Sequence, residues 1–293
     1  MKTILLTPTK NEDWILAKTL PIFSNIADEI IVSDQNSEDN TLSILNQFKK
    51  IKIITNHRKY HSNEVRWELL EEARKLYGSN NLIICLDADE YIPSHLFFKN
   101  KKNIIKNKPG TAFQSPWVQL WRSVSKYRSD TGVWNPKTNF KPFMFLDNGI
   151  SSYLDEVIIN DHTSRIPTKN ILNIKTINIP VIHLQFANWE RAQIKQIWYM
   201  CSELMRGSSA TEINNKYINS IKEDGLKLTK VKKAWIKDLN SDLSFKTYDN
   251  DELWYLKEIE NMFKTKSPLF FKNLNIWQNK NVIKIKLNLD LQE

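Results

Sequence analysis

The stretch LIICLDADE, residues 82–90, decides the fold class of this chain. Its first five residues are apolar, and a continuous apolar run of this length is typical of a strand that is buried on both faces. Three carboxylates follow within the next four residues. The stretch therefore predicts a buried strand whose carboxyl end carries acidic side chains.

Three similar apolar runs precede it, and an amphipathic stretch of helical period separates each run from the next. The runs are ILLT (4–7), EIIVS (29–33) and IKIIT (51–55), and the amphipathic stretches cover residues 12–26, 38–50 and 63–77. Regular alternation of strand and helix predicts parallel strands joined by right-handed crossovers. The expected fold class is α/β, with a Rossmann-like, mostly parallel sheet flanked by helices.

Beyond residue 93 the periodicity is less regular. It predicts helices at 94–106 and 187–206, strands within 111–121, 139–146, 152–159 and 178–184, then several helices and a final short strand, VIKIKLNL, at 282–289. We expect residues 1–95 and 96–206 to be two halves of one domain. Residues 207–293 are predicted to form a mainly helical C-terminal extension.

Composition excludes several classes of protein. The 293 residues are 41% hydrophobic and 26% charged, the balance of an ordinary globular protein. Only 6 residues are Gly, and neither GxGxxG nor GxxxxGK[ST] occurs, so a nucleotide site here is not built on a glycine-rich phosphate loop. Cys85 and Cys201 are too far apart in the chain to form a CxxC unit, and we expect both to be reduced core residues.

The N-terminal apolar stretch is too short for a signal peptide, and no run reaches the length of a membrane span, so a cytoplasmic location is the default expectation. The net charge of +9 is uneven, because residues 1–95 hold 11 Lys and Arg against 14 Asp and Glu. The basic remainder suits an anionic membrane surface, a nucleic acid, a phosphorylated substrate or simple solvation. Its Lys-rich stretch at 222–237 is expected to be a helix, either resting peripherally on a membrane or solvated.

Polar residues follow all four strand runs, and in an open parallel sheet ligands bind beyond the carboxyl ends of the strands. Asp87 and Asp89 alternate along an extended chain, so both can face one ligand while Ala88 packs behind them. Two such close carboxylates repel each other unless a cation lies nearby, and Mn²⁺ or Mg²⁺ is the natural choice. The alternative is that Asp89 or Glu90 caps the start of the following turn.

Three segments resemble the nucleotide-sugar-binding half of an inverting family 2 glycosyltransferase with the GT-A fold. They are TPTKNE (7–12), with Pro8, Asn11 and Glu12; IIVSDQNSEDNT (30–41), with Asp34, Ser37 and Asp39; and LIICLDADEYI (82–92), with Asp87 and Asp89. Gln35 and Asn36 depart from the Asp and Gly of the family pattern. The resemblance extends over about residues 1–95 and is thinner beyond.

The resemblance implies a set of donor-binding residues and a metal site. Asp34 would accept a hydrogen bond from the base, Asp87 would contact the ribose or metal-bound water, and Asp89 would coordinate the metal on the donor diphosphate. A UDP-sugar is the favoured donor. The implied donor-binding residues are Thr7, Pro8, Thr9, Glu12, Asp34, Arg66, Asp87 and Ala88, and the implied metal ligands are Asp89, Asp87 and His183.

An inverting transfer needs a base that takes the proton from the acceptor hydroxyl. Members of the family often carry a His-Glu pair in a later strand-like segment, and Asp155-Glu156 occupies that place here. Glu156 is the predicted base, with Asp155 as the alternative. His183 follows the run IPVI and resembles the family's His before a helix, although a core histidine fits the same pattern.

The function that follows is a metal-dependent inverting transfer of a sugar to the hydroxyl of a glycan or a lipid-linked acceptor, in cell-surface polysaccharide or lipopolysaccharide synthesis. Residues 1–95 would bind the nucleotide-sugar and residues 96–206 the acceptor. Three alternatives stay open: nucleotidyl transfer on a similar sheet, an inactive nucleotide-sugar binder, and a nucleic-acid-binding protein that uses the basic half of the chain. The nucleic-acid interpretation is not favoured, because the acidic strand end has no role in it.

Overall fold

A computed structural model describes residues 1–58, 62–153, 163–222, 224–239 and 253–291. The chain divides into two compact units. The N-terminal unit comprises Met1–Leu184 and Leu228–Phe245, and the C-terminal unit comprises Gln185–Lys227 and Lys246–Glu293. The sequence-based boundaries at residues 95 and 206 divide the chain by expected role and stay predictions.

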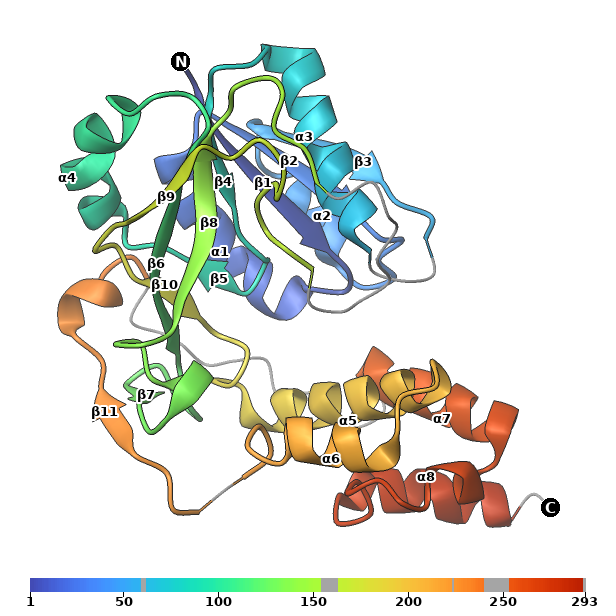
Figure 1. The fold of residues 1–293 in the computed structure, drawn as a ribbon. Coiled ribbons are helices and arrows are strands. Elements are labelled where there is room, and N and C mark those ends of the chain that lie inside the picture. Colours follow the sequence, from blue (N-terminus) through green and yellow to red (C-terminus); the bar gives the residue numbers. More distant parts are fainter. Residues whose placement is uncertain (59–61, 154–162, 223, 240–252, 292–293) are drawn as a thin grey trace. The chain divides into compact units, whose positions relative to one another are not determined.

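The four predicted parallel strands are confirmed. They are β1 (Thr3–Thr9), β2 (Glu29–Asp34), β3 (Ile51–Thr55) and β4 (Leu82–Cys85), paired in the order β3-β2-β1-β4. Ile4, Leu5 and Leu6 are all at most 1% exposed, so both faces of β1 are covered, as a continuous apolar run predicts. Since the strands are parallel, their carboxyl ends lie along one edge of the sheet (Figure 1).

Helices α1 (Asp13–Ile26), α3 (Asn63–Tyr77) and α4 (Ser94–Ile105) form where the periodicity predicts them. Leu69 and Ala73 of α3 pack against Ile4 and Ile83 on one face of the sheet. The predicted helix at 38–50 is wrong in length, because only α2 (Thr41–Leu45) forms. Residues on either side of α2 are held in turns, and the Asp39 carboxylate accepts hydrogen bonds from the backbone N–H of Asp13 and Thr41.

The sheet continues with antiparallel pairing. β8 (Phe140–Leu146) runs antiparallel to both β4 and β6 (Thr111–Gln119), which makes the sheet mixed. β6 also pairs in parallel with β9 (Asn173–Thr176) and β10 (Val181–His183), and β10 pairs antiparallel with the two-residue strand β5 (Glu90–Tyr91). The predicted strand at 152–159 lies mostly outside the described residues, and Ser152 forms an isolated bridge with Lys169.

The Lys-rich stretch at 222–237 is not the helix that was predicted. Its described residues contain β11 (Leu228–Lys230) and a 3₁₀ turn, η2 (Lys233–Trp235). β11 pairs antiparallel with β7 (Lys126–Arg128), so backbone pairing overrides the local helical pattern. A further 3₁₀ turn, η1 (Gly132–Trp134), follows β7.

The C-terminal unit is helical, as predicted. It contains α5 (Trp189–Met205), α6 (Ala210–Tyr217), α7 (Trp254–Lys266), the 3₁₀ turn η3 (Pro268–Phe271) and α8 (Lys280–Asp290). Its core includes Ile194, Ile259, Phe263 and Val282. Among the described residues, no helix is both long enough and apolar enough to cross a bilayer.

The predicted strand at 282–289 is wrong, since these residues belong to α8. The Asn279 side chain accepts hydrogen bonds from the backbone N–H of Asn281 and Val282 and so caps the helix. Val282, Ile285 and Leu289 pack against the core at helical spacing. The alternating apolar and polar residues therefore hid a helical period.

Candidate active site

The loops that follow β1 and β2 are joined by side-chain hydrogen bonds. The backbone N–H of Asn11 donates to Ser37 Oγ at 2.8 Å, and Asn11 Oδ1 accepts from the backbone N–H of Glu38 at 2.7 Å. The backbone N–H of Glu12 donates to Thr41 Oγ1 at 2.8 Å. These bonds fix both loops at the edge of the sheet where a ligand is expected.

The predicted base-binding residue, Asp34, lies within this pair of loops. Its carboxylate accepts hydrogen bonds from Ser37 Oγ at 2.6 Å, from Thr9 Oγ1 at 3.2 Å and from the Ser37 N–H at 3.0 Å. Asp34 is only 2% exposed. The structure thus brings Thr9 and Asp34 together, and the Asp34 carboxylate braces the loop.

The other predicted residues of this pocket lie nearby on the same strand and loop. Thr7 is fully buried in β1, while Pro8 is half-buried and lies opposite Ser33 in the strand register. The Glu12 carboxylate accepts a hydrogen bond from Trp14 Nε1 at 2.5 Å. Thr7 and Pro8 thus lie within β1 and Glu12 lies just after it, and their part in donor binding stays a prediction.

The acidic residues after β4 form a turn, which we call the acidic cluster: Asp87, Asp89 and Glu90. The Asp87 N–H donates to Glu90 Oε2 at 2.9 Å, and the Glu90 N–H donates to the Asp87 carbonyl at 3.0 Å. Thr19 Oγ1 donates to the carbonyl of Ala88 at 2.8 Å, which anchors the turn to α1. Asp89 and Glu90 are 3% and 0% exposed.

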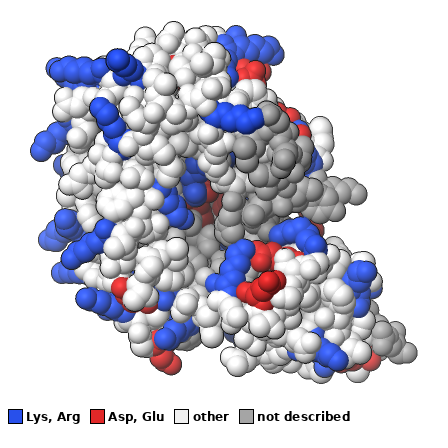
Figure 2. Space-filling view, viewed as in Figure 1, with Lys and Arg blue, Asp and Glu red and all other residues white. Residues whose placement is uncertain are grey.

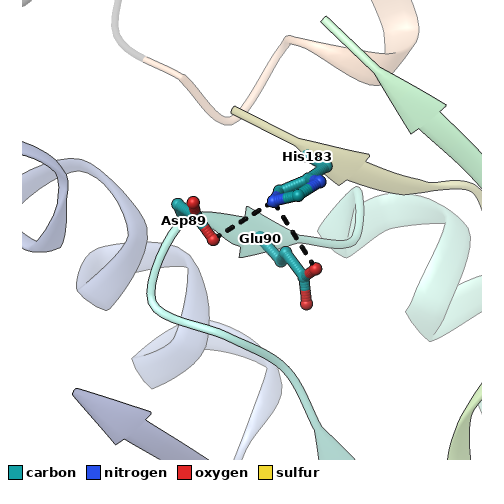
Figure 3. Close-up of side chains that lie close together, drawn as sticks. All are labelled: Asp89, Glu90 and His183. Carbon is teal, nitrogen blue, oxygen red and sulfur yellow. Dashed lines mark ion pairs between the residues drawn. The ribbon is translucent and has the colours of Figure 1, made fainter. Parts of the chain in front are cut away.

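His183 reaches this cluster from β10 (Figure 3). It lies opposite Glu90 in the antiparallel register, and its Nε2 is 3.4 Å from Asp89 Oδ1 and 3.8 Å from Glu90 Oε1. His183 Nδ1 is buried and has no hydrogen-bond partner among the described residues. The predicted approach of His183 to Asp89 is therefore present in the structure.

Arg66 contacts the acidic cluster from α3. Its Nη2 donates to Asp87 Oδ1, and the side chain is 3% exposed. Its Nε and Nη1 atoms are buried and have no hydrogen-bond partner among the described residues. Three of the five guanidinium donors thus lie away from water beside the acidic cluster with no described acceptor.

Arg165 is a second cation at the cluster, and the sequence analysis missed it. Its Nη2 donates to Asp87 Oδ2 at 2.8 Å and to Glu90 Oε1 at 2.6 Å. Burial raises the pKa of Asp87, but the charges of Arg165 and Arg66 outweigh burial and hold that pKa well below its usual value. For Glu90, burial prevails over Arg165 and raises the pKa.

Trp117 and Lys141 flank Arg165. The Arg165 guanidinium lies 4.5 Å from the centre of the Trp117 ring, and Lys141 Nζ lies 5.2 Å from it. The ring also meets His183 edge-on, with 6.3 Å between the ring centres. Burial, followed by the charge of Arg165, lowers the pKa of Lys141. Aromatic and cationic groups thus line the cluster.

The donor set fits a divalent cation. Asp89, Glu90 and His183 each offer one ligand atom, and these atoms lie within 4.8 Å of one another. Carboxylate oxygen with imidazole nitrogen suits Mn²⁺, and carboxylates with water suit Mg²⁺. The three carboxylates of the cluster are surrounded by three cationic side chains, Arg66, Arg165 and Lys141.

The structure thus groups Asp87, Asp89, Arg66 and His183 at one place and Thr9, Glu12 and Asp34 at the neighbouring strand ends. Asp87 was predicted to be a metal ligand, but it pairs with Arg66 and Arg165. The acidic residue grouped with Asp89 and His183 is Glu90. Asp155 and Glu156 lie outside the described residues. The flanking Tyr153 is described, and its hydroxyl donates to the backbone carbonyl of Arg165 at 2.8 Å.

Basic side chains do not gather at one place on the face of the molecule seen in Figure 2. Lys and Arg are dispersed there and separated by uncharged surface. Nucleic-acid-binding proteins typically present a continuous basic patch or stripe.

Solved structures resemble this chain at low sequence identity. A TarS fragment (1–349) from S. aureus has a TM-score of 0.43 and 12% identity, covering 100% of this chain and 92% of that one. A second TarS structure has a TM-score of 0.44 and 11% identity, covering 98% and 55%. Glucosyl-3-phosphoglycerate synthase from Mycobacterium tuberculosis has a TM-score of 0.29 and 16% identity, covering 40% and 44%. A comparison with curated proteins gives no significant match.

The family model for glycosyl transferase family 2 matches residues 4–187. This range contains all the strands of the large sheet and the acidic cluster. The resemblance seen in the sequence is confirmed, and with it the α/β fold of GT-A type. Because the match covers more than half of the chain, the chain belongs to glycosyl transferase family 2.

Proposed function

We propose that this glycosyltransferase moves a sugar, with inversion, from a nucleotide-sugar donor to a hydroxyl of a glycan or lipid-linked acceptor. A UDP-sugar is the favoured donor, and cell-surface polysaccharide or lipopolysaccharide synthesis is the favoured setting. The observation that carries the proposal is the convergence of Asp89, Glu90 and His183 at the end of β4, within 4.8 Å of one another. In a family 2 chain, this is where a metal-bound donor diphosphate is expected.

Mn²⁺ or Mg²⁺ would be held by Asp89, Glu90 and His183. When bound, the ion would offset the negative charge that develops on the diphosphate leaving group. Asp87 faces the same site but is paired with Arg66 and Arg165, so in this proposal it binds the donor. Thr7, Pro8, Thr9, Glu12, Ala88 and Asp34 complete the donor site.

The two Arg side chains have a defined electrostatic task in this proposal. They keep Asp87 ionised, and the buried Nε and Nη1 of Arg66 have no acceptor among the described residues, whereas a diphosphate would supply oxygen acceptors. Groups held in place before the donor arrives stabilise developing charge without reorganising during the reaction. Arg66 therefore acts as a donor-binding residue, as the sequence predicts.

Glu156 is the proposed base, with Asp155 as the alternative. The base takes the proton from the acceptor hydroxyl as the oxygen forms its bond to the anomeric carbon and the sugar–phosphate bond breaks. The choice of these residues rests on the resemblance of Asp155-Glu156 to the His-Glu pair of the family. An oxocarbenium-like transition state is expected, as in glycoside hydrolysis.

A turnover assay tests this proposal. Purified protein is incubated with UDP-, GDP-, CMP- and dTDP-sugars and Mn²⁺, with and without glycan acceptors, and the released nucleotide is quantified. We expect release from one donor class, loss of at least about a hundredfold in Glu156→Gln or Asp155→Asn, and little change in Glu71→Gln, whose side chain is 50% exposed. Donor binding without turnover would indicate the inactive binder, and stabilisation by nucleic acid alone would contradict the proposal.

A further inference from the structure

Helix α8 belongs to the C-terminal unit and is the red helix labelled in Figure 1. It carries an exposed apolar stripe. Ile283, Leu287 and Leu291 are 39%, 55% and 86% exposed, and their spacing of four residues aligns them along one side of the helix. The core contacts of α8 come from the opposite side, through Val282 and Leu289. The stripe is therefore left over after the unit has formed its core.

A second exposed apolar group lies next to α8. Leu269 and Phe270 of η3 are 68% and 44% exposed. A recess of about 360 Å³ is lined both by η3 residues, including Leu269, and by α8 residues, including Lys286 and Leu289. Helix α8 and η3 therefore border one recess, and each carries exposed apolar side chains.

Lysine dominates the charge of this surface. Residues 264–291 contain six Lys and one Asp, with no Arg or Glu. All six lysines are exposed, and five of them lie at the end of α7, directly after η3 or on α8: Lys266, Lys272, Lys280, Lys284 and Lys286. Together with Leu269, Phe270, Ile283, Leu287 and Leu291 they make up what we call the apolar-basic face.

We propose that the apolar-basic face rests on the surface of an anionic lipid bilayer. Exposed Leu and Phe side chains enter the boundary between headgroups and acyl chains, and the lysines contact the lipid phosphates. Protein interfaces are depleted in Lys, and a nucleic acid gives no reason to expose Leu side chains. The proposal does not depend on the reaction proposed above, because it concerns a surface of the C-terminal unit alone.

Vesicle co-sedimentation of the full chain tests the proposal. The probes are vesicles of phosphatidylcholine alone and vesicles in which a third of the lipid is phosphatidylglycerol. The test variants are Leu287→Asn/Leu291→Asn and Lys280→Gln/Lys284→Gln. The matched controls change exposed residues of α4, as Phe98→Asn/Ile105→Asn and Lys99→Gln/Lys102→Gln. Thermal unfolding confirms that each variant is folded.

We expect binding to the anionic vesicles only. Each Lys near an anionic surface strengthens binding roughly fivefold, so the double Lys variant should bind about twenty-fivefold more weakly, with a loss of at least about tenfold for the double Leu variant. Both controls should bind like the unchanged protein. The proposal is overturned if the protein does not bind vesicles, or binds neutral and anionic vesicles equally. It is also overturned if the α4 control variants lose as much vesicle binding as the test variants. A dimer in sedimentation velocity that Leu287→Asn/Leu291→Asn dissociates would likewise contradict it.

Discussion

Arg165 Nη2 donates to Asp87 Oδ2 at 2.8 Å and so joins two residues that lie 78 positions apart in the chain. The same nitrogen donates to Glu90 Oε1 at 2.6 Å, so one guanidinium holds both ends of the acidic turn. The contact connects the loop before β9 to the residues that follow β4 within the N-terminal unit. It also sets the charge that a bound cation and diphosphate would meet.

Replacing Arg165 with Met is expected to destabilise the protein. A buried ion pair that loses one partner costs about 3–5 kcal/mol. Arg165 pairs with Glu90, which is 0% exposed, and with Asp87, which is 33% exposed, so we expect a loss of about 3 kcal/mol in the free energy of unfolding by urea. The matched variant Arg58→Met breaks pairs with Glu64 and Glu68, which are both 40% exposed, and should cost less than about 1 kcal/mol. Equal losses in the two variants would show that Arg165 contributes no more than a surface charge.

His183→Asn is expected to weaken binding of Mn²⁺ by at least about tenfold, because it removes the imidazole from the three-residue ligand set. Titration of Mn²⁺ followed by electron paramagnetic resonance measures the free ion directly. His95 is exposed on α4, so His95→Asn is the control and should leave the affinity unchanged. Unchanged Mn²⁺ affinity in His183→Asn would remove His183 from the proposed metal site.

Variants of Asp34 and Ser37 distinguish two roles of Asp34, which are to stabilise the loop and to bind the nucleotide base. Ser37→Ala removes the Oγ that both donates to Asp34 and accepts from Asn11, and should cost about 1 kcal/mol of stability. Asp34→Asn should cost a similar amount, but should also lower donor affinity roughly tenfold, because a charged acceptor for the base is lost. If isothermal titration shows the same donor affinity for both variants, Asp34 only braces the loop.

The two cysteines are expected to resist thiol reagents in the folded protein. Burial raises the pKa of Cys85 and of Cys201 to about 12, and the thiolate is the reactive form. At pH 8 almost no thiolate is present, so Ellman's reagent should label neither residue in the native state and both in urea. Rapid labelling of a native thiol would contradict the buried placement of that residue.

The regular part of the fold follows from local sequence patterns. The four apolar runs become β1–β4 and the stretch at 63–77 becomes α3, because each pattern reports burial of its own segment. Residues 282–289 show where this reasoning fails, since apolar residues on both sides of α8 mimic the alternation of a strand. One side packs on the core, and the other side is the apolar-basic face.

The site could be predicted only in part, for a related reason. Asp89 and His183 follow from strand-end chemistry and family resemblance. Glu90 lies beside them because β5 pairs with β10 in a register that places Glu90 opposite His183. Neither segment alone predicts this pairing register. Arg165 lies in a polar loop with no periodic signal, and only the folded chain brings it to the cluster.

Metal-dependent donor binding is the direct test of a metal-bound donor at the end of β4. The unfolding temperature of the unchanged protein and of Asp89→Asn is measured with a panel of nucleotide-sugars, with and without Mn²⁺. Binding at a hundred times Kd stabilises by about 2.7 kcal/mol, which raises Tm by several degrees. We predict a Mn²⁺-dependent rise in Tm with one nucleotide class, and Asp89→Asn should abolish this rise. A rise that persists in Asp89→Asn, or no rise with any nucleotide-sugar, would contradict a metal-bound donor at the end of β4.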